Sequence, residues 1–277
     1  MALYGDETRP RMGFFTDTSV CIGCKACEVA CKEWNHVPAA PHGFTGDSLD
    51  NTSDLDADHW RHVAFVEQRV EADPLTMAAT GLQTYQGGDG MRWLMASDVC
   101  KHCTHAACLE VCPTGALFRT EFGTVVIQED VCNGCGYCIP ACPFGVIGRR
   151  EEDGRAWKCT LCYDRLQDDQ TPACAKACPT ESIQFGELDE LRERAGTRLA
   201  ALHDAGLADA QLYGADHEDG VGGFGAFFLL LDEPETYNLP PDPVDPVRRI
   251  GEIWAAAGAA AAALGGALAA AALWRRS

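Results

Sequence analysis

Residues 132–144 read CNGCGYCIPACPF, and their cysteine spacing is the strongest indication of the fold in the sequence. It places four cysteines in the spacing C-x2-C-x2-C-x3-C, followed directly by Pro143. Three thiolates on one tight loop can each meet a different iron of a cubane, while the fourth corner of that cubane faces away from the loop. In this spacing the first three cysteines bind one [4Fe–4S] cluster and the fourth binds a neighbouring cluster. The stretch therefore predicts half of a two-cluster ferredoxin unit.

All sixteen cysteines of the 277-residue chain fall into four such quartets. The first quartet repeats the same spacing, and the second and fourth keep the opening C-x2-C and the closing C-x3-C-P but lengthen the loop between them. A longer loop can still deliver its third ligand at a modest extra cost in closure entropy. The sequence thus predicts four [4Fe–4S] clusters. The quartets are Cys21, Cys24, Cys27 and Cys31; Cys100, Cys103, Cys108 and Cys112; Cys132, Cys135, Cys138 and Cys142; and Cys159, Cys162, Cys174 and Cys178.

The quartets form an internal repeat that resembles two copies of one two-cluster unit, nested one inside the other. The inner unit is contiguous and spans about residues 97–148, while the outer unit combines the first and last quartets. A rival pairing of the first quartet with the second would exchange the fourth ligands only. In the nested arrangement the ligand sets are Cys21, Cys24, Cys27 with Cys178; Cys159, Cys162, Cys174 with Cys31; Cys100, Cys103, Cys108 with Cys142; and Cys132, Cys135, Cys138 with Cys112.

Two other uses of cysteine are the alternatives to clusters. Zinc ribbons contain two C-x2-C pairs and a longer spacer, without a third cysteine at the same step or a closing C-x3-C-P. Disulfide frameworks are typical of small secreted chains, whereas here long cysteine-free stretches separate tight quartets. The spacing therefore favours clusters over zinc and over disulfides.

Residues between and beside the cysteines are expected to tune the clusters. Glycines stand between ligands in the first and third quartets, where a side chain would obstruct the approach of the backbone to the sulfides. The second and fourth quartets have His102 and Leu161 at the matching position, so we expect unlike potentials for the four clusters. Nearby histidines are interpreted as surface or hydrogen-bonding groups, and nearby lysines either offset cluster charge or are simply solvated. These residues are Gly23, Gly134, Gly136, His36, His102, His105, Lys25, Lys101, Lys158 and Lys176.

Charge and composition limit the function further. The formal net charge is −19, from 41 acidic and 22 basic side chains, and such a field repels nucleic acid. We find no phosphate-binding loop, dinucleotide fingerprint or nucleophile elbow, so no catalytic residue is predicted. The first thirty residues contain no apolar signal core and no twin-arginine signal. If the chain works outside the cytoplasm, we expect another subunit to carry it there.

The remaining secondary structure is predicted from hydrophobic pattern and turn residues. Residues 38–58 are expected to form a loop, 86–90 a turn, and the proline-rich residues 234–246 an extended linker. A helix is expected over about residues 188–203. Strands are expected at residues 13–16, 62–70, 91–96, 116–120, 124–128, 182–185 and 226–231, with 116–128 forming a hairpin that turns at 121–123.

The last segment, residues 253–274, contains no charged residue. As a helix its 22 residues would extend about 33 Å, close to the thickness of a bilayer's hydrocarbon core. Trp254 and Trp274 stand at its ends like interfacial anchors. We therefore predict an α+β chain of two nested ferredoxin-like two-cluster units with insertions, plus one C-terminal transmembrane helix. The expected domains are residues 1–240, a linker at 241–252 and the helix at 253–274; an Ala-rich soluble helix or a frayed tail is the alternative for the last.

The quartets, with CIGCKACEVACKEWN at residues 21–35 and KCTLC at 158–162, resemble the iron–sulfur subunits of complex molybdoenzymes. Within that group the chain is most similar to the beta subunit of membrane-bound formate dehydrogenase. The resemblance implies a non-catalytic electron-transfer subunit that receives electrons from a formate-oxidising molybdenum or tungsten pterin subunit. It also implies a membrane cytochrome b partner that reduces quinone, and a single-pass anchor with the cluster domain on the outer, extracytoplasmic face.

Three alternative functions remain at this point. The equivalent subunit of a hydrogenase or of another molybdoenzyme reductase would have the same quartets. A free polyferredoxin would carry the clusters without a membrane partner. A zinc-stapled scaffold would have no redox role.

Overall fold

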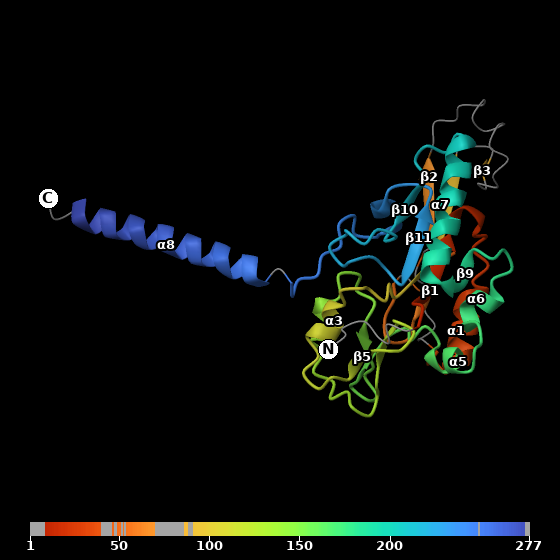
Figure 1. Ribbon diagram of the computed structural model, residues 1–277, viewed down its shortest axis with the longest axis horizontal. Coiled ribbons are helices and arrows are strands. Elements are labelled where there is room, and N and C mark those ends of the chain that lie inside the picture. The colour runs from red at the N-terminus through yellow and green to blue at the C-terminus, as the bar shows by residue number, and fades with distance from the viewer. Residues whose placement is uncertain are drawn as a thin grey trace.

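The computed structural model describes residues 9–39, 46, 49–50, 52, 54–69, 86–87, 91–248 and 250–274. Figure 1 shows a body that contains the strands and the shorter helices, and one long helix, α8 (Ile250–Trp274), that projects away from it. Hydrophobic side chains of the body form one buried cluster that includes cysteines from all four quartets. The cysteine loops are therefore part of the core of the body.

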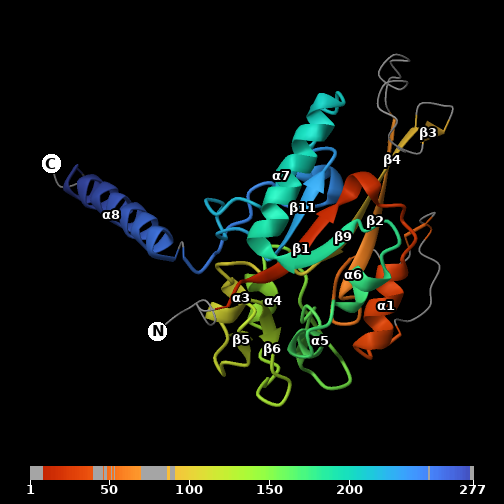
Figure 2. The same ribbon diagram turned by 45° about the vertical axis from the view of Figure 1, so that its right-hand side comes forward.

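The largest sheet pairs a strand from the start of the chain with strands that follow the fourth quartet. Its strand order is β10-β11-β1-β9, with β1 parallel to β11 and antiparallel to β9. All five residues of β11 are buried, and helix α7 (Leu188–Asp204) packs against β1 and β9 (Figure 2). This confirms the strands predicted at 13–16, 182–185 and 226–231 and the helix predicted at 188–203. The strands are β1 (Met12–Asp17), β9 (Ile183–Glu187), β10 (Gln211–Tyr213) and β11 (Ala226–Leu230).

This sheet also brings the first and last quartets together. Strand β1 leads through the 3-10 turn η1 (Thr18–Val20) into Cys21, and Cys178 lies shortly before β9. Because β1 and β9 are hydrogen-bonded neighbours, with Thr16 opposite Ile183, the start of the first quartet lies near the end of the fourth. These two quartets are more than a hundred residues apart in the sequence.

A second sheet has the order β2-β4-β3, from β2 (Arg61–Arg69), β4 (Met91–Val99) and β3 (Gln86–Gly87). The predicted strands are confirmed, except that residue 70 lies outside the described residues. The predicted turn at 86–90 is wrong at its start, because Gln86 and Gly87 pair antiparallel with Arg92 and Met91 and so satisfy backbone groups at the edge of β4. Residues 88–90 lie outside the described residues. The described parts of 38–58 are loop, as predicted.

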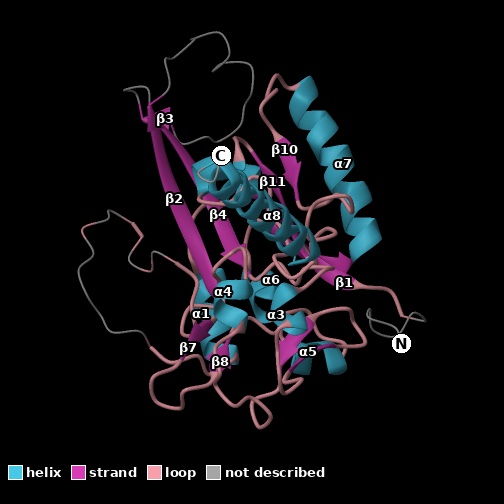
Figure 3. Cartoon of the chain, turned by 90° about the vertical axis from the view of Figure 1, so that its left-hand side faces the viewer, coloured by secondary structure: helices cyan, strands magenta, loops and turns pink. Residues whose placement is uncertain are grey.

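The inner quartets lie among small hairpins and short helices. The predicted hairpin is confirmed as β5 (Leu117–Arg119) and β6 (Val125–Ile127), and β7 (Gly148–Arg149) pairs with β8 (Ala156–Trp157). Figure 3 shows the short helices gathered below the long strands. Helix α1 packs against α6, and α3 packs against α4. The short helices are α1 (Ala26–Trp34), α3 (Ala107–Glu110), α4 (Cys138–Ala141), α5 (Tyr163–Gln167) and α6 (Ala173–Ala177).

The proline-rich segment is not extended along its whole length, which corrects the prediction for residues 234–246. It begins with a 3-10 helix, η2 (Pro234–Tyr237), whose first residue is a proline that loses no hydrogen bond there. Tyr237 is 4% exposed and its hydroxyl accepts from the Leu231 N–H. Asp245 is also buried. The start and end of the segment therefore pack against the body before α8 begins.

Candidate iron–sulfur sites

The four cysteine loops share one backbone shape at the second residue after the opening cysteine. Its φ is 63° at Gly23, 45° at His102, 71° at Gly134 and 58° at Leu161, all in the left-handed region. That region costs a residue with a side chain about 1–2 kcal/mol. His102 and Leu161 adopt it in spite of this cost, so the turn is a requirement of the loop and not a consequence of glycine alone.

Helices α1 and α6 bring the outer quartets together. One cavity is lined by Cys21, Cys24 and Cys27 of the first quartet together with Cys178 of the fourth. Cys31, four residues after Cys27 along α1, lies instead among Cys159, Cys162 and Cys174, whose charges act on it. Each quartet thus contributes three cysteines to one group and its last cysteine to the other. We name these groups site I (Cys21, Cys24, Cys27, Cys178) and site IV (Cys159, Cys162, Cys174, Cys31).

Helices α3 and α4 repeat the arrangement for the inner quartets. A second cavity is lined by Cys100, Cys103, Cys108 and Cys142. Cys138 lies close to Cys132, Cys135 and Cys112, whose charges act on it. We name these groups site II (Cys100, Cys103, Cys108, Cys142) and site III (Cys132, Cys135, Cys138, Cys112).

The four groups follow one another in a row. Electrostatic neighbours link Cys27 of site I to Cys174 of site IV. They also link Cys159 of site IV to Cys100 of site II, and Cys108 of site II to Cys138 of site III. The two cysteines with exposed side chains are Cys24 in site I and Cys135 in site III. The spatial order is therefore I, IV, II, III, and each end of the row reaches the surface.

The thiols suit a multinuclear iron centre. All sixteen cysteines are free, so no disulfide competes for them. Within the described part of the chain, no three His, Cys, Asp or Glu side chains converge closely enough to hold a single ion, whereas a cubane fills a wider space. Burial raises the pKa of Cys108 and of Cys159 to about 12. These thiols are thus neutral without metal and become thiolates when iron displaces their protons.

Two lysines beside the cysteines are buried, which contradicts the solvated interpretation for them. Lys101 is 0% exposed, forms an ion pair with Asp98 and donates to the Val99 carbonyl oxygen at 2.9 Å. Lys158 is 2% exposed and donates to the carbonyl oxygens of Val125 and Cys159. A buried ammonium is costly unless negative charge lies near it, and thiolate-bound cubanes would supply that charge. Lys176 is exposed, as the solvated interpretation expects.

His102 is a hydrogen-bonding residue, as predicted. It is buried, and its Nδ1 accepts from the Val125 N–H at 3.1 Å. Burial holds its pKa well below the usual value, so the ring is neutral and its proton is on Nε2. That nitrogen has no hydrogen-bond partner among the described residues, and His102 is one of the residues that line the cavity of site II.

Sequence reasoning missed three polar residues that touch the cysteines. Arg61 donates from Nη2 to the Cys174 sulfur at 3.2 Å. The Ser97 hydroxyl lies 3.2 Å from the Cys27 sulfur. The Asn35 amide lies 3.7 Å from the sulfurs of both Cys31 and Cys162. Arg61 alone had a sequence signal, because it is a charged residue immediately before the predicted strand at 62–70.

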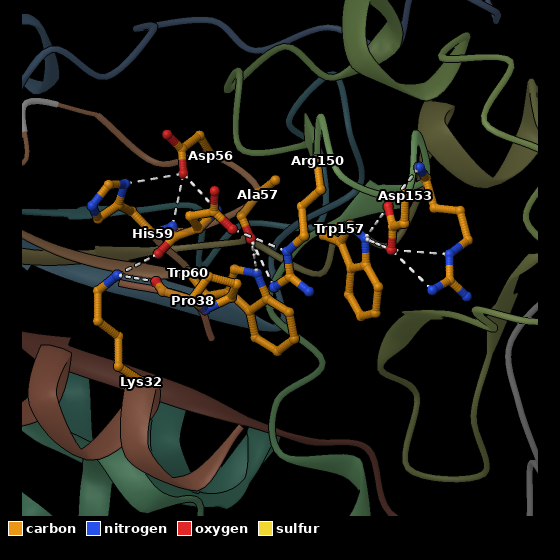
Figure 4. Close-up of polar contacts among 11 residues, drawn as sticks. Lys32, Pro38, Asp56, Ala57, His59, Trp60, Arg150, Asp153 and Trp157 are labelled. Carbon is orange, nitrogen blue, oxygen red and sulfur yellow. Dashed lines mark hydrogen bonds and ion pairs between the residues drawn. The ribbon is translucent and has the colours of Figure 1, made fainter. Parts of the chain in front are cut away.

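A polar and aromatic network joins the outer unit to the hairpin that follows the third quartet (Figure 4). Lys32, directly after Cys31, donates to the Asp58 carbonyl oxygen at 2.6 Å. Arg150 of the β7–β8 turn donates to the Asp58 carboxylate at 3.0 Å. Its guanidinium lies 4.0 Å from the centre of the Trp157 ring, which stacks on Trp60. These contacts hold the loop before β2 against the β7–β8 hairpin.

Comparison with known proteins agrees with this geometry. Two family models described as "4Fe-4S dicluster domain" match residues 20–116 and 91–188. The sequence is 42% identical over 231 residues to the "Formate dehydrogenase iron-sulfur subunit" of Haemophilus influenzae, covering 82% of this chain and 68% of that one. This protein belongs to the family of formate dehydrogenase iron–sulfur subunits. It is 41% identical to the "Formate dehydrogenase, nitrate-inducible, iron-sulfur subunit" of Escherichia coli, with 82% and 71% covered.

Membership of this family confirms the predicted resemblance, and with it a role in electron transfer without catalysis of its own. Two dicluster domains with sixteen cysteines account for four [4Fe–4S] clusters. The chemistry that such clusters supply is the reversible exchange of single electrons. The sequence is also 36% identical to a subunit of the anaerobic dimethyl sulfoxide reductase of Escherichia coli, over 69% of this protein and 80% of that subunit.

The loop of site III in this iron–sulfur subunit provides a test of close packing. A Cβ at Gly134 would collide with the carbonyl oxygen of Gly154, so Gly134→Ala is expected to displace the loop between Cys132 and Cys138. We expect a lower midpoint of thermal unfolding and loss of about one cluster's iron. Gly206→Ala is the control, because Gly206 also has a positive φ but has open space around it. Equal loss in both variants would mean that backbone strain, and not the collision, is responsible.

Proposed function

We propose that this chain carries electrons from a catalytic subunit that oxidises formate to a membrane partner of the cytochrome b type, which reduces quinone. The observation that carries the proposal is 39–42% identity over 82% of the chain to iron–sulfur subunits named for formate dehydrogenase. The expected catalytic subunit contains a molybdenum or tungsten pterin. This chain provides the cluster ligands, the buried surroundings of the clusters and fixed charges near them. Its partners catalyse formate oxidation and quinone reduction.

The proposed ligand sets are the four sites defined above, in two nested ferredoxin-like units within an α+β body. The cavity that Cys178 shares with the first quartet supports the outer pairing, and the cavity that Cys142 shares with the second quartet supports the inner one. The matching packing of α1 on α6 and of α3 on α4 supports two copies of one unit. The rival pairing of the first quartet with the second would require different neighbours for Cys31 and Cys142.

We also infer which end of the row of sites serves which partner. Arg248, shortly before α8, lies 3.7 Å from Glu110 of α3, within the second quartet. Helix α8 therefore leaves the body beside the inner pair of sites (Figure 1). We assign the site III end, with exposed Cys135, to the membrane partner, and the site I end, with exposed Cys24, to the catalytic subunit.

Helix α8 is proposed to anchor the chain in the membrane as a single span. The stretch of residues 250–267 is long and apolar enough to cross a bilayer, and none of these residues is buried against the body. A lone apolar helix exposed along this length would be unfavourable in water. We propose that the body lies on the outer, extracytoplasmic face, exported together with the catalytic subunit.

Anaerobic purification of the tagged chain in mild detergent tests the proposal. We expect a large subunit with a pterin-bound metal to co-purify, and formate to reduce the clusters of the complex. Reduction by hydrogen instead, or oxidation of pre-reduced clusters by dimethyl sulfoxide, would contradict the formate assignment. The sulfoxide outcome is the second candidate because of the 36% identity to a reductase subunit. Recovery of the native chain from cytosol without detergent and without partners would favour a free polyferredoxin.

A further inference from the structure

Arg61 places a positive charge inside the body, between the two outer sites. It is the first residue of strand β2, and its side chain is 2% exposed. Its hydrogen bonds go from Nη2 to the Cys174 sulfur at 3.2 Å, and from Nη1 to the Ser97 carbonyl and hydroxyl oxygens, each at 3.2 Å. None of these acceptors is a carboxylate. Among the described residues its Nε has no hydrogen-bond partner.

Ser97 extends this contact to the other outer site. It is 1% exposed and lies on β4, opposite Val63 of β2. Its hydroxyl accepts from Arg61 and lies 3.2 Å from the sulfur of Cys27. A continuous buried series of contacts therefore runs from Cys174 of site IV through Arg61 and Ser97 to Cys27 of site I. Phe14 closes one side of it, with the guanidinium 5.0 Å from the ring centre.

The charge of Arg61 needs a counter-ion that the described carboxylates do not provide. A guanidinium buried without a paired anion would be strongly destabilising. The ionisable groups that act most on Arg61 are the thiols of Cys174, Cys27, Cys159 and Cys31, which belong to both outer sites. With thiolate ligands and iron in place, each of these sites holds net negative charge, which the guanidinium offsets.

We propose that Arg61, positioned by Ser97, is the shared counter-ion of sites I and IV and sets the reduction potentials of both clusters. A fixed positive charge stabilises the reduced, more negative form of a nearby cluster and so raises its potential. Because the charge lies between the two sites, it acts on both, while the cavity of site II is lined by buried Lys101 and Lys158. Arg61 is a positioning and tuning residue, and it contributes no ligand. The inference rests on the ligand sets proposed above.

The test is an anaerobic redox titration of the purified complex, followed by electron paramagnetic resonance. Arg61→Met removes the charge and keeps an apolar chain of similar length. We expect two of the four midpoint potentials to fall, with the reduction equilibrium of each weakened at least tenfold, which is about 59 mV for a one-electron couple. The other two should stay in place. Arg61→Lys retains the charge and is expected to recover most of the midpoint potential that Arg61→Met loses.

Two further variants separate tuning from general damage. Ser97→Ala should lower mainly the potential of site I, because it removes the hydroxyl beside Cys27 and leaves Arg61 bonded to Cys174. Arg165→Met is the matched control, since Arg165 is 5% exposed but stacks on Trp34 and donates to the Thr171 carbonyl oxygen. It should shift the outer potentials much less than Arg61→Met.

Iron analysis distinguishes the failure of this inference from the failure of the proposed function. Unchanged potentials in an Arg61→Met complex with full iron would overturn the role of Arg61 and leave the ligand sets standing. A fall as large in Arg61→Lys or Arg165→Met would also overturn it, because charge at this position would then not be the cause. If Arg61→Met loses iron, Arg61→Lys and Ser97→Ala decide the matter with the clusters in place. Wild-type protein with far less iron than four clusters need would contradict the proposed ligand sets themselves.

Discussion

Replacing Cys142 with serine is expected to remove or convert the cluster of site II while the cluster of site III stays intact. Cys142 belongs to the third quartet by sequence, but it lines the cavity of the second quartet with Cys100, Cys103 and Cys108. A serine oxygen is a harder and weaker ligand for iron than a thiolate. Anaerobic iron analysis should show loss of up to about a quarter of the iron, and spin quantification should show one altered cluster.

Two comparison variants identify which cluster is lost. Cys108→Ser should alter the same paramagnetic signal as Cys142→Ser, because both residues belong to site II. Cys138→Ser should alter a different one, because Cys138 lies among the cysteines of site III. If Cys142→Ser instead matches Cys138→Ser, or damages both signals equally, the crossed ligand sets are wrong. If it matches Cys162→Ser, the rival pairing of quartets is correct.

Local spacing in the sequence was sufficient to predict the clusters, because three of each set of four ligands lie on one short loop. The hairpin at residues 116–128 and the strand before Cys21 were equally local, since their patterns of apolar and turn residues need no distant partner to be recognised. The same cysteine spacing predicted that fourth ligands are exchanged, but it left open which quartets exchange them. Support for the nested pairing comes from the packing of α1 on α6, which no spacing reveals.

The surroundings of the clusters could not be predicted because they are made by tertiary contacts. Arg61 and Ser97 reach Cys174 and Cys27 from β2 and β4, which are far from those cysteines in sequence. Lys101 and Lys158 stand beside ligands, yet their burial depends on the strands and rings that close over them. Tertiary contacts also decide the structure of residues 234–237, where prolines indicated a linker but Tyr237 is buried in the core.

Deleting residues 252–277 is expected to release the body from the membrane. Helix α8 is 25 residues long, so it extends about 37 Å and can span the hydrocarbon core. Without it, the body keeps only its contacts with partner subunits. After an alkaline carbonate wash of native membranes, the wild-type chain should stay in the pellet and the truncated chain should appear in the supernatant. Iron content should be unchanged, because no ligand lies beyond Cys178.

A single substitution in the helix separates anchoring from loss of the segment. Leu264→Arg keeps the length of α8 and places a charge near the middle of the span, where it costs about 2.5–3.5 kcal/mol for insertion. It should weaken retention in the wash, whereas Leu264→Ala should not. Since none of residues 250–267 is buried in the body, neither change should affect its thermal unfolding. Membrane association that survives both the deletion and the arginine would mean that partner contacts alone hold the protein there, and α8 would then have to pack on a partner outside the bilayer.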